Sequence, residues 1–381
     1  MILRDTCYFC TSPFQFIPIL DLALSRQEKA DLYIDPQFED ADQFAERINA
    51  TGLFCNVVVI NSELIYGKYF TARQGLLNHF QIARSYLKVN EIAKLILLKD
   101  TNYNNMFVST RAYIPRLITL YFIKNSIQTK LVYFEDGNGS YFGNQAYYPR
   151  LMDRIVRRVL FGKEALNVSH TRYLFSPEFF FLLNDIDNLN DIDNNSNIKR
   201  LPRILGNRNL FEVLNSVFSY GTKSLIHERF IILDVLQSIL FDGENQSKLI
   251  DIYKLIICEA GYSETIIKKH PRNSDDEIEK AKYYSFSGIP FECICLNTDM
   301  NKKVLVSYGS TSAGTPKLLL NQEPVIVLLY RLIKPKSKSF EKEMEVYFSK
   351  LQYLYSDKSK IIIPENIDEL CIAVNKIKDL R

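Results

Sequence analysis

Residues 6–24 read TCYFCTSPFQFIPILDLAL and have the pattern of a strand, a loop and a helix, which recurs along the rest of the chain. The first six residues form a short, mostly apolar run that is typical of a strand, and Ser12-Pro13 ends it. From residue 14 the apolar side chains follow helical spacing, and Pro13 suits the first turn of a helix. This segment therefore predicts one strand–loop–helix unit of a parallel sheet, with its loop at residues 11–15.

The same alternation recurs along both halves of the chain. In the first half we expect a helix at 114–124 and further strands at residues 31–34, 56–60, 95–98, 107–109 and 130–134. In the second half we expect a helix at 247–259 and strands at residues 230–234, 264–268, 292–296, 303–306 and 325–329. Between the two halves, the near-repeat NDIDNLNDIDN at 184–194 favours turns and predicts a linker.

With 381 residues the chain exceeds the usual size of one domain. We therefore predict an α/β protein of two Rossmann-like lobes with a cleft between them, an arrangement like that of GT-B enzymes. We place the N-terminal lobe at residues 1–190 and the C-terminal lobe at residues 191–381. In open parallel sheets, ligands bind beyond the carboxyl ends of the strands, so motifs that directly follow strands are the candidates for a site.

The composition excludes several classes of protein. Hydrophobic residues make up 47% and charged residues 24%, which excludes a disordered or collagen-like chain. A formal net charge of +3 gives no indication of nucleic-acid binding. The N-terminus lacks a signal segment, the apolar runs are too short to span a membrane, and the seven cysteines are scattered, so we expect a bacterial-type cytoplasmic protein. We expect buried thiols rather than a zinc site at Cys7, Cys10, Cys293 and Cys295.

Two acidic residues and two glycines follow an expected strand in FEDGNGSY, residues 134–141. A carboxylate at a strand end can point toward a ligand, and glycines let the backbone approach that ligand closely. Asp136 is therefore the candidate general base. The alternative is a turn in which Asp136 only accepts hydrogen bonds from backbone amides.

A second strand ends in the basic segment IIKKHPR, residues 266–272, which holds one of only four histidines. Lys268, Lys269 and the imidazole of His270 suit a phosphate. His270 can also donate a proton or a hydrogen bond to a departing phosphate oxygen. The alternative is a solvated basic turn.

Small and hydroxyl-bearing residues follow a third strand in SYGSTSAGTP, residues 307–316. Ser310, Thr311 and Ser312 at the start of a helix can hold a phosphate or carboxylate, or they form a simple N-cap turn. The spacing matches neither a P-loop nor a dinucleotide-binding glycine motif, so ATP and NAD are not indicated. In the segment GIPFEC, Glu292 opens an expected strand and can accept hydrogen bonds from ribose hydroxyls.

In this order the motifs resemble those of glycosyltransferase family 52, the bacterial lipooligosaccharide and capsule sialyltransferases. The matching elements are Glu135-Asp136-Gly137, His270-Pro271, Ser310-Thr311 and the first loop, Thr11-Ser12-Pro13-Phe14-Gln15. Ser12 is an extra residue in the Thr-Pro-Phe-Gln pattern of the family, and Thr311 stands where related enzymes have a second serine. The resemblance covers the chain from residue 7 to about residue 330.

The resemblance implies an inverting, metal-independent transfer of sialic acid from CMP-sialic acid to a galactose-type hydroxyl of a cell-surface glycan, lipooligosaccharide or capsule, without a cofactor. Asp136 would take the proton of the acceptor hydroxyl, and His270 would assist the departing nucleotide. The residues expected on the donor side are Lys268, Lys269, Pro271, Glu292, Ser310, Thr311 and Ser312. The residues expected on the acceptor side are Thr11, Ser12, Gln15, Gly137 and Asn138.

Two other functions stay open. The chain can be another glycosyltransferase of the same family, such as a hexosyltransferase or a polysialyltransferase, or a sugar-nucleotide-binding partner without catalysis. The segment RLMDRIVRRVLF at 150–161 predicts a basic amphipathic helix. Such a helix either packs on its own domain, or contacts the inner face of the cell membrane, or forms part of a homodimer interface.

Overall fold

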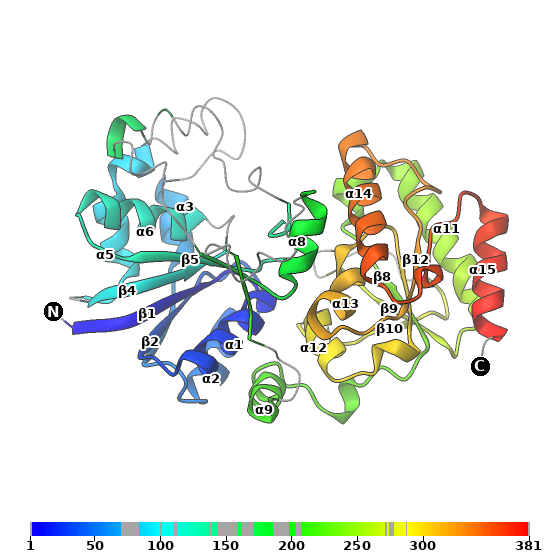
Figure 1. The fold of residues 1–381 in the computed structure, drawn as a ribbon, viewed down its shortest axis with the longest axis horizontal. Helices are drawn as coiled ribbons and strands as arrows, with labels where there is room; N and C mark the ends of the chain where they lie inside the picture. Colours follow the sequence, from blue (N-terminus) through cyan, green and yellow to red (C-terminus); the bar gives the residue numbers. More distant parts are fainter. Residues whose placement is uncertain are drawn as a thin grey trace. The chain divides into compact units, whose positions relative to one another are not determined.

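The computed structural model describes residues 2–69, 84–99, 101–109, 113–137, 139–142, 155, 158–161, 171–185, 198–202, 207–270, 273, 278–286 and 288–379. Its internal contacts divide the chain into two compact units, Met1–Val217 (unit 1) and Phe218–Arg381 (unit 2). Each unit consists of a parallel sheet with helices on both faces (Figure 1). The predicted class, α/β with two Rossmann-like halves, is confirmed.

Unit 1 has a seven-stranded parallel sheet in the order β3-β2-β1-β4-β5-β6-β7. The strands are β1 (Ile2–Cys10), β2 (Ala30–Ile34), β3 (Asn56–Val59), β4 (Thr101–Val108), β5 (Lys130–Phe134), β6 (Thr171–Leu174) and β7 (Ile198–Arg200). The helices are η1 (Pro13–Gln15), α1 (Phe16–Arg26), α2 (Ala41–Asn49), α3 (Ser62–Tyr69), α5 (Val89–Ile96), α6 (Tyr113–Lys124), α8 (Pro177–Leu183) and α9 (Arg208–Val217). Figure 1 shows α3, α5 and α6 on one face of this sheet and α1 and α2 on the other.

The strand β1 lies in the interior of this sheet and is covered on both faces. Phe9 stacks on Tyr33 with ring centroids 5.0 Å apart, within the apolar cluster that also contains the inner faces of α5 and α6. The neighbouring Tyr8 points to the opposite face and packs on Phe107, 4.8 Å away between centroids. A continuous apolar run, rather than an alternating one, is the pattern of a parallel strand buried on both sides.

Unit 2 has a six-stranded parallel sheet in the order β10-β9-β8-β11-β12-β13. The strands are β8 (Phe230–Leu233), β9 (Thr265–Lys268), β10 (Lys282–Tyr283), β11 (Val304–Ser307), β12 (Val325–Leu328) and β13 (Ile361–Ile362). The α-helices are α10 (Gln237–Leu240), α11 (Gly243–Ala260), α12 (Phe291–Leu296), α13 (Thr315–Leu320), α14 (Lys338–Leu354) and α15 (Ile367–Asp379). The 3-10 helices are η5 (Thr222–Ser224), η6 (Met300–Lys302), η7 (Thr311–Gly314) and η8 (Lys358–Lys360). Figure 1 shows α11 and α15 on one side of the sheet and α12 and α13 on the other.

Each sheet has one switch point, where the chain reverses the direction in which it adds strands. In unit 1, β2 and β3 lie on one side of β1, and β4 to β7 lie on the other. In unit 2, β9 and β10 lie on one side of β8, and β11 to β13 lie on the other. The switch points therefore fall between β1 and β4 and between β8 and β11. Ligands of open parallel sheets bind beyond the carboxyl ends of the strands at such points.

Two of the predicted strands are wrong. Residues 95 and 96 of the expected strand at 95–98 form the end of α5, and the expected strand at 292–296 lies within α12. Both segments are short apolar runs, and periodicity does not distinguish a buried strand from a buried helix over so few residues. Glu292 therefore does not open a strand but lies in the first turn of a helix.

The other predicted strands correspond to β1, β2, β3, β4, β5, β8, β9, β11 and β12, whereas β6, β7, β10 and β13 are additional. The expected boundary between residues 190 and 191 falls inside unit 1, because β7 pairs with β6 and α9 packs on α1 and α2. Residues 186–194 of the expected linker lie outside the described residues.

Only part of the expected basic helix at 150–161 is described. Residue 155 and residues 158–161 are helical, and the side chain of Val159 is 77% exposed. Phe161 packs edge-on against Tyr86 of the unit 1 core. Among the described residues, no helix combines the length and the apolar character that a bilayer span requires. Contacts of this helix with a membrane or with a second copy stay predictions.

Gly314 lets the turn after β11 pack closely against α14. A Cβ atom at this position would lie 2.8 Å from the Tyr347 hydroxyl oxygen and 3.2 Å from Leu351 Cδ2. We expect Gly314→Ala to lower the free energy of unfolding by about 1–3 kcal/mol through overpacking, as measured by urea denaturation. Gly243→Ala at the start of α11 is the control, because nothing lies within 4 Å of its added Cβ. Equal stabilities of the two variants would contradict this account of the packing.

Candidate functional site

The side chain of Glu135 holds the turn that follows β5. This residue is 5% exposed, and its Oε2 atom accepts hydrogen bonds from the Tyr141 hydroxyl (2.7 Å) and the Phe175 amide (2.7 Å). The Tyr141 oxygen in turn accepts a hydrogen bond from the Ser176 amide (3.2 Å). The carboxylate therefore ties the end of β5 to the segment that leads from β6 into α8. We assign Glu135 a structural role.

Asp136 comes next in the chain and is half-buried. Its amide donates to Ser140 Oγ (2.7 Å), and the Ser140 carbonyl oxygen accepts a hydrogen bond from Arg172 Nη1 (3.2 Å). Gly137 has φ +68°, a left-handed conformation that glycine adopts without strain. These contacts fix the backbone at Asp136. The expected acceptor residue Asn138 lies outside the described residues.

Asp136 lies close to the end of β1. Burial, together with the negative charge of Asp136, raises the pKa of the Cys10 thiol to about 12, while the hydrogen bond from that thiol to the Ser12 carbonyl oxygen opposes the shift. Thr11 and Gln15 form a reciprocal pair, in which the Thr11 amide donates to Gln15 Oε1 (2.8 Å) and Gln15 Nε2 donates to Thr11 Oγ1 (2.9 Å). Gln15 is 1% exposed, so we interpret it as a support of the loop rather than as a contact to an acceptor.

Lys268 and Glu292 lie close together in unit 2. Burial lowers the pKa of the Lys268 ammonium to about 8, and the Glu292 carboxylate opposes that shift. Burial also raises the pKa of Glu292, which is opposed by its own backbone amide, by Lys268 and by a hydrogen bond from the Thr315 side chain. The Lys268 Nζ atom lies 5.3 Å from the ring centroid of Tyr284. The structure thus brings together two of the expected donor-side residues and adds Thr315, which directly follows η7.

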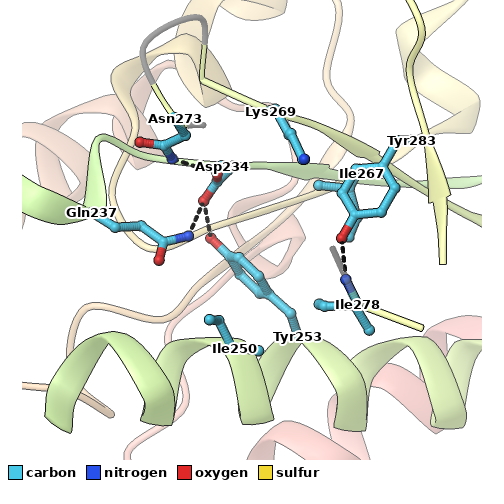
Figure 2. Close-up of a pocket in the computed structure, with 9 residues that line it drawn as sticks. All are labelled: Asp234, Gln237, Ile250, Tyr253, Ile267, Lys269, Asn273, Ile278 and Tyr283. Carbon is cyan, nitrogen blue, oxygen red and sulfur yellow. Dashed lines mark hydrogen bonds between the residues drawn. The ribbon is translucent and has the colours of Figure 1, made fainter. Parts of the chain in front are cut away.

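Lys269 points to the other face of the same sheet. Its Nζ atom lies 4.7 Å from the ring centroid of Tyr283. It lines a cavity of about 20 Å³ beside α11, together with Asp234, Tyr253 and Asn273 (Figure 2). A space of this size holds about one water molecule and is too small for a nucleotide. The two lysine side chains therefore lie in different surroundings, and Lys268 is the one that lies beside Glu292.

His270 lies two residues beyond β9 and is half-buried, whereas Pro271 lies outside the described residues. Both candidate catalytic residues therefore lie two residues beyond the carboxyl end of a parallel strand, Asp136 in unit 1 and His270 in unit 2. This is the end of the strands at which open parallel sheets bind ligands.

The hydroxyl of Ser307 joins the ends of β8 and β11 at the switch point of unit 2. It donates to the Leu233 carbonyl oxygen (3.3 Å) and accepts from the amides of Gly309 (3.3 Å) and Ser310 (2.8 Å). Ser310 is the N-cap of η7, and its hydroxyl oxygen accepts from the Ser312 amide (3.4 Å). Ser310, Thr311 and Ser312 are all half-buried. The N-cap and the anion-binding interpretations are compatible here, because a hydroxyl that accepts one hydrogen bond still has its hydrogen to donate.

Sequence reasoning missed two residues of this region. Asp234 directly follows the buried strand β8, as Glu135 follows β5, so the rule that found the acidic pair at 135–136 also applies to it. Asn273 has no comparable signal, because its importance comes from contacts across the sheet edge rather than from its place in a motif. Among the described residues, no three His, Cys, Asp or Glu side chains gather as metal ligands. Cys7, Cys10, Cys293 and Cys295 are buried thiols, as expected.

No protein-family model and no curated protein matches the chain. Among solved structures, one titled "Crystal structure of TcCGT1 in complex with UDP" is similar at 10% sequence identity, with a TM-score of 0.41 and coverage of 99% of both chains. The assignment of the fold rests on the topology of the two sheets and not on this match.

Replacing Glu135 tests its structural role. Glu135→Leu leaves the Phe175 amide and the Tyr141 hydroxyl without their buried acceptor, so we expect a loss of about 2–5 kcal/mol in the free energy of unfolding. Glu135→Gln keeps an acceptor oxygen and should cost about 1 kcal/mol. Chemical denaturation of both variants measures the difference. Equal losses would show that the charge of Glu135, and not its acceptor geometry, holds the turn.

Proposed function

We propose that the chain is a glycosyltransferase in which unit 2 binds the nucleotide of a sugar donor and unit 1 supplies the general base, Asp136. One observation carries this proposal: in both units, candidate residues follow the carboxyl ends of strands that lie at or beside the switch point. Thr11 follows β1, and the turn at 310–312 follows β11. Asp136 and His270 follow strands of the same two sheets.

The proposed reaction is a displacement at the anomeric carbon of the donor. The oxygen of the acceptor hydroxyl forms a bond to that carbon, and the bond from the carbon to the phosphate oxygen breaks with its electron pair going to the phosphate. Asp136 takes the proton of the acceptor hydroxyl. His270 and the hydroxyls at 310–312 donate hydrogen bonds to the departing phosphate, whose negative charge grows in the transition state. Attack opposite the leaving group inverts the configuration at the anomeric carbon.

We propose further that the donor is CMP-sialic acid and the acceptor a galactose-type hydroxyl of a cell-surface glycan, lipooligosaccharide or capsule. The resemblance of the motifs to glycosyltransferase family 52 supports this choice. A departing monophosphate also suits a site with the basic and hydroxyl-bearing groups Lys268, His270 and Ser310, and Glu292 is the candidate partner of the ribose. We place the reaction in the cytoplasm, where a sugar nucleotide is available to the enzyme. The alternatives are another sugar donor and a binding protein without turnover.

A donor screen tests both proposals, that the chain is a glycosyltransferase and that its donor is CMP-sialic acid. We expect release of CMP from CMP-sialic acid in the presence of a terminal galactoside, and no turnover of uridine-linked sugars. Asp136→Asn and His270→Gln should each lower kcat by about 10²–10⁴-fold, because each removes a proton-transfer or hydrogen-bonding group at the reacting atoms. Asp42→Asn and His227→Gln change exposed side chains and serve as matched controls.

The outcomes of this screen separate the hypotheses. Turnover of a uridine-linked sugar alone would contradict the sialyl donor but keep the glycosyltransferase. Binding of a cytidine nucleotide without turnover of any donor would favour the binding protein. Unchanged rates in both Asp136→Asn and His270→Gln would overturn the assigned catalytic residues.

Lys268 should make the affinity for the nucleotide depend on pH. Its pKa of about 8 means that the ammonium present at neutral pH is lost as the pH rises through 8. CMP keeps a dianionic phosphate over this range, because its second pKa is about 6. We expect its affinity, measured by calorimetry, to fall about three- to tenfold between about pH 7 and about pH 9.5. Lys268→Met should bind more weakly at neutral pH without this decline, and a decline as large as in the wild type would exclude Lys268 as its cause.

A further inference from the structure

Asp234 is the centre of a buried network at the end of β8. It is 9% exposed, and its Oδ1 atom accepts hydrogen bonds from the Val235 amide (2.9 Å), Gln237 Nε2 (3.0 Å) and the Tyr253 hydroxyl (3.4 Å). Its Oδ2 atom accepts from Asn273 Nδ2 (2.6 Å). Figure 2 shows these side chains converging on the carboxylate from α10, α11 and the segment after β9. Four donors hold this carboxylate in one orientation, because turning it away would leave buried donors without an acceptor.

Asn273 connects this network to the candidate catalytic histidine. Its Nδ2 group donates twice to the segment after β8, once to Asp234 Oδ2 and once to the Val235 carbonyl oxygen (2.7 Å). The backbone amide of Asn273 donates to the His270 carbonyl oxygen (2.9 Å). The Asp234 amide also donates to the Lys268 carbonyl oxygen (3.1 Å), which extends the pairing of β8 and β9 by one step. Both ends of the segment from 268 to 273 are thus held by the residues that follow β8.

We propose that Asp234 and Asn273 form a clamp that positions His270. This inference rests on the proposed function for the role of His270, but the clamp itself stands on the hydrogen bonds above. Asp234 and Asn273 do not touch the reacting atoms and act only through the backbone of His270. They are positioning residues.

The physical reason for such a clamp is the position of His270, two residues beyond the end of β9 and outside the strand itself. A side chain that must meet a phosphate oxygen within hydrogen-bond reach loses rate steeply when its backbone moves by an ångström. The side-chain amide of Asn273 donates two hydrogen bonds to the residues after β8, and these bonds fix both its distance from those residues and its orientation. A buried, fully partnered carboxylate is a rigid anchor for them, because rotating it away leaves several donors without a partner.

The test follows the His270 imidazole directly by NMR. The chain has four histidines, so ¹³Cε1-labelled histidine gives four signals, and His270→Gln identifies the one of interest. In Asn273→Ala and Asn273→Gln we expect the His270 signal to move and broaden while the signal of the exposed His227 stays unchanged. Gln237→Met is the matched control, because it removes an amide donor from the other oxygen of the same carboxylate without touching Asn273. Its His270 signal should stay in place.

Kinetics of the same full-length variants completes the test. We expect Asn273→Ala to lower kcat about tenfold to a hundredfold with KM for the acceptor unchanged, and Gln237→Met to stay within about twofold of the wild type. An unmoved His270 signal in both folded Asn273 variants would overturn the clamp, as would an equal change in Gln237→Met. A moved His270 signal without sugar transfer by any of the proteins, the wild type included, would support the clamp and reject the proposed function.

Discussion

A buried carboxylate at the end of a parallel strand organises the candidate site in each unit. Glu135 after β5 accepts hydrogen bonds from Tyr141 and Phe175, and Asp234 after β8 accepts four. A charge removed from water is tolerated only when donors replace the water, so each carboxylate draws nearby segments into a fixed arrangement. The half-buried residues close by, Asp136 and His270, are held in place by these arrangements. In the proposed function, the buried carboxylate of each unit supplies rigidity, and a neighbouring half-buried side chain at the same end of that unit's sheet supplies the chemistry.

This division explains why two adjacent acids have different roles. Glu135 and Asp136 both carry a carboxylate, yet one is 5% exposed with two hydrogen bonds to a single oxygen, and the other is half-buried beside the end of β1. The pleat of a strand turns successive side chains to opposite sides, so one acid of a pair at a strand end enters the core when the other does not. The same argument applies to Lys268, beside Glu292, and Lys269, beside α11.

Much of the fold could be predicted because parallel strands buried on both faces leave continuous apolar runs. The runs at β1, β8, β11 and β12 are of this kind. β7, which reads Ile198-Lys199-Arg200, has no such run, and it joins the sheet only through its pairing with β6. The segment at α12 reads as a strand but is a helix, because a six-residue segment with five apolar side chains fits either structure and only the surrounding packing decides. Sequence patterns therefore predict the interiors of sheets better than their edges.

The candidate site was predictable for residues in motifs and not for residues that act across the sheet. His270 and Ser310 lie two and three residues beyond the ends of strands with apolar runs, so a rule about strand ends finds them. Asn273 carries no such signal, since its two side-chain donors reach Asp234 and Val235, which are distant in the chain. Contacts of this kind form only because neighbouring parallel strands end at the same edge. The sheet edge that carries the candidate side chains also brings their supports within hydrogen-bond reach, and a linear motif contains little information about these supports.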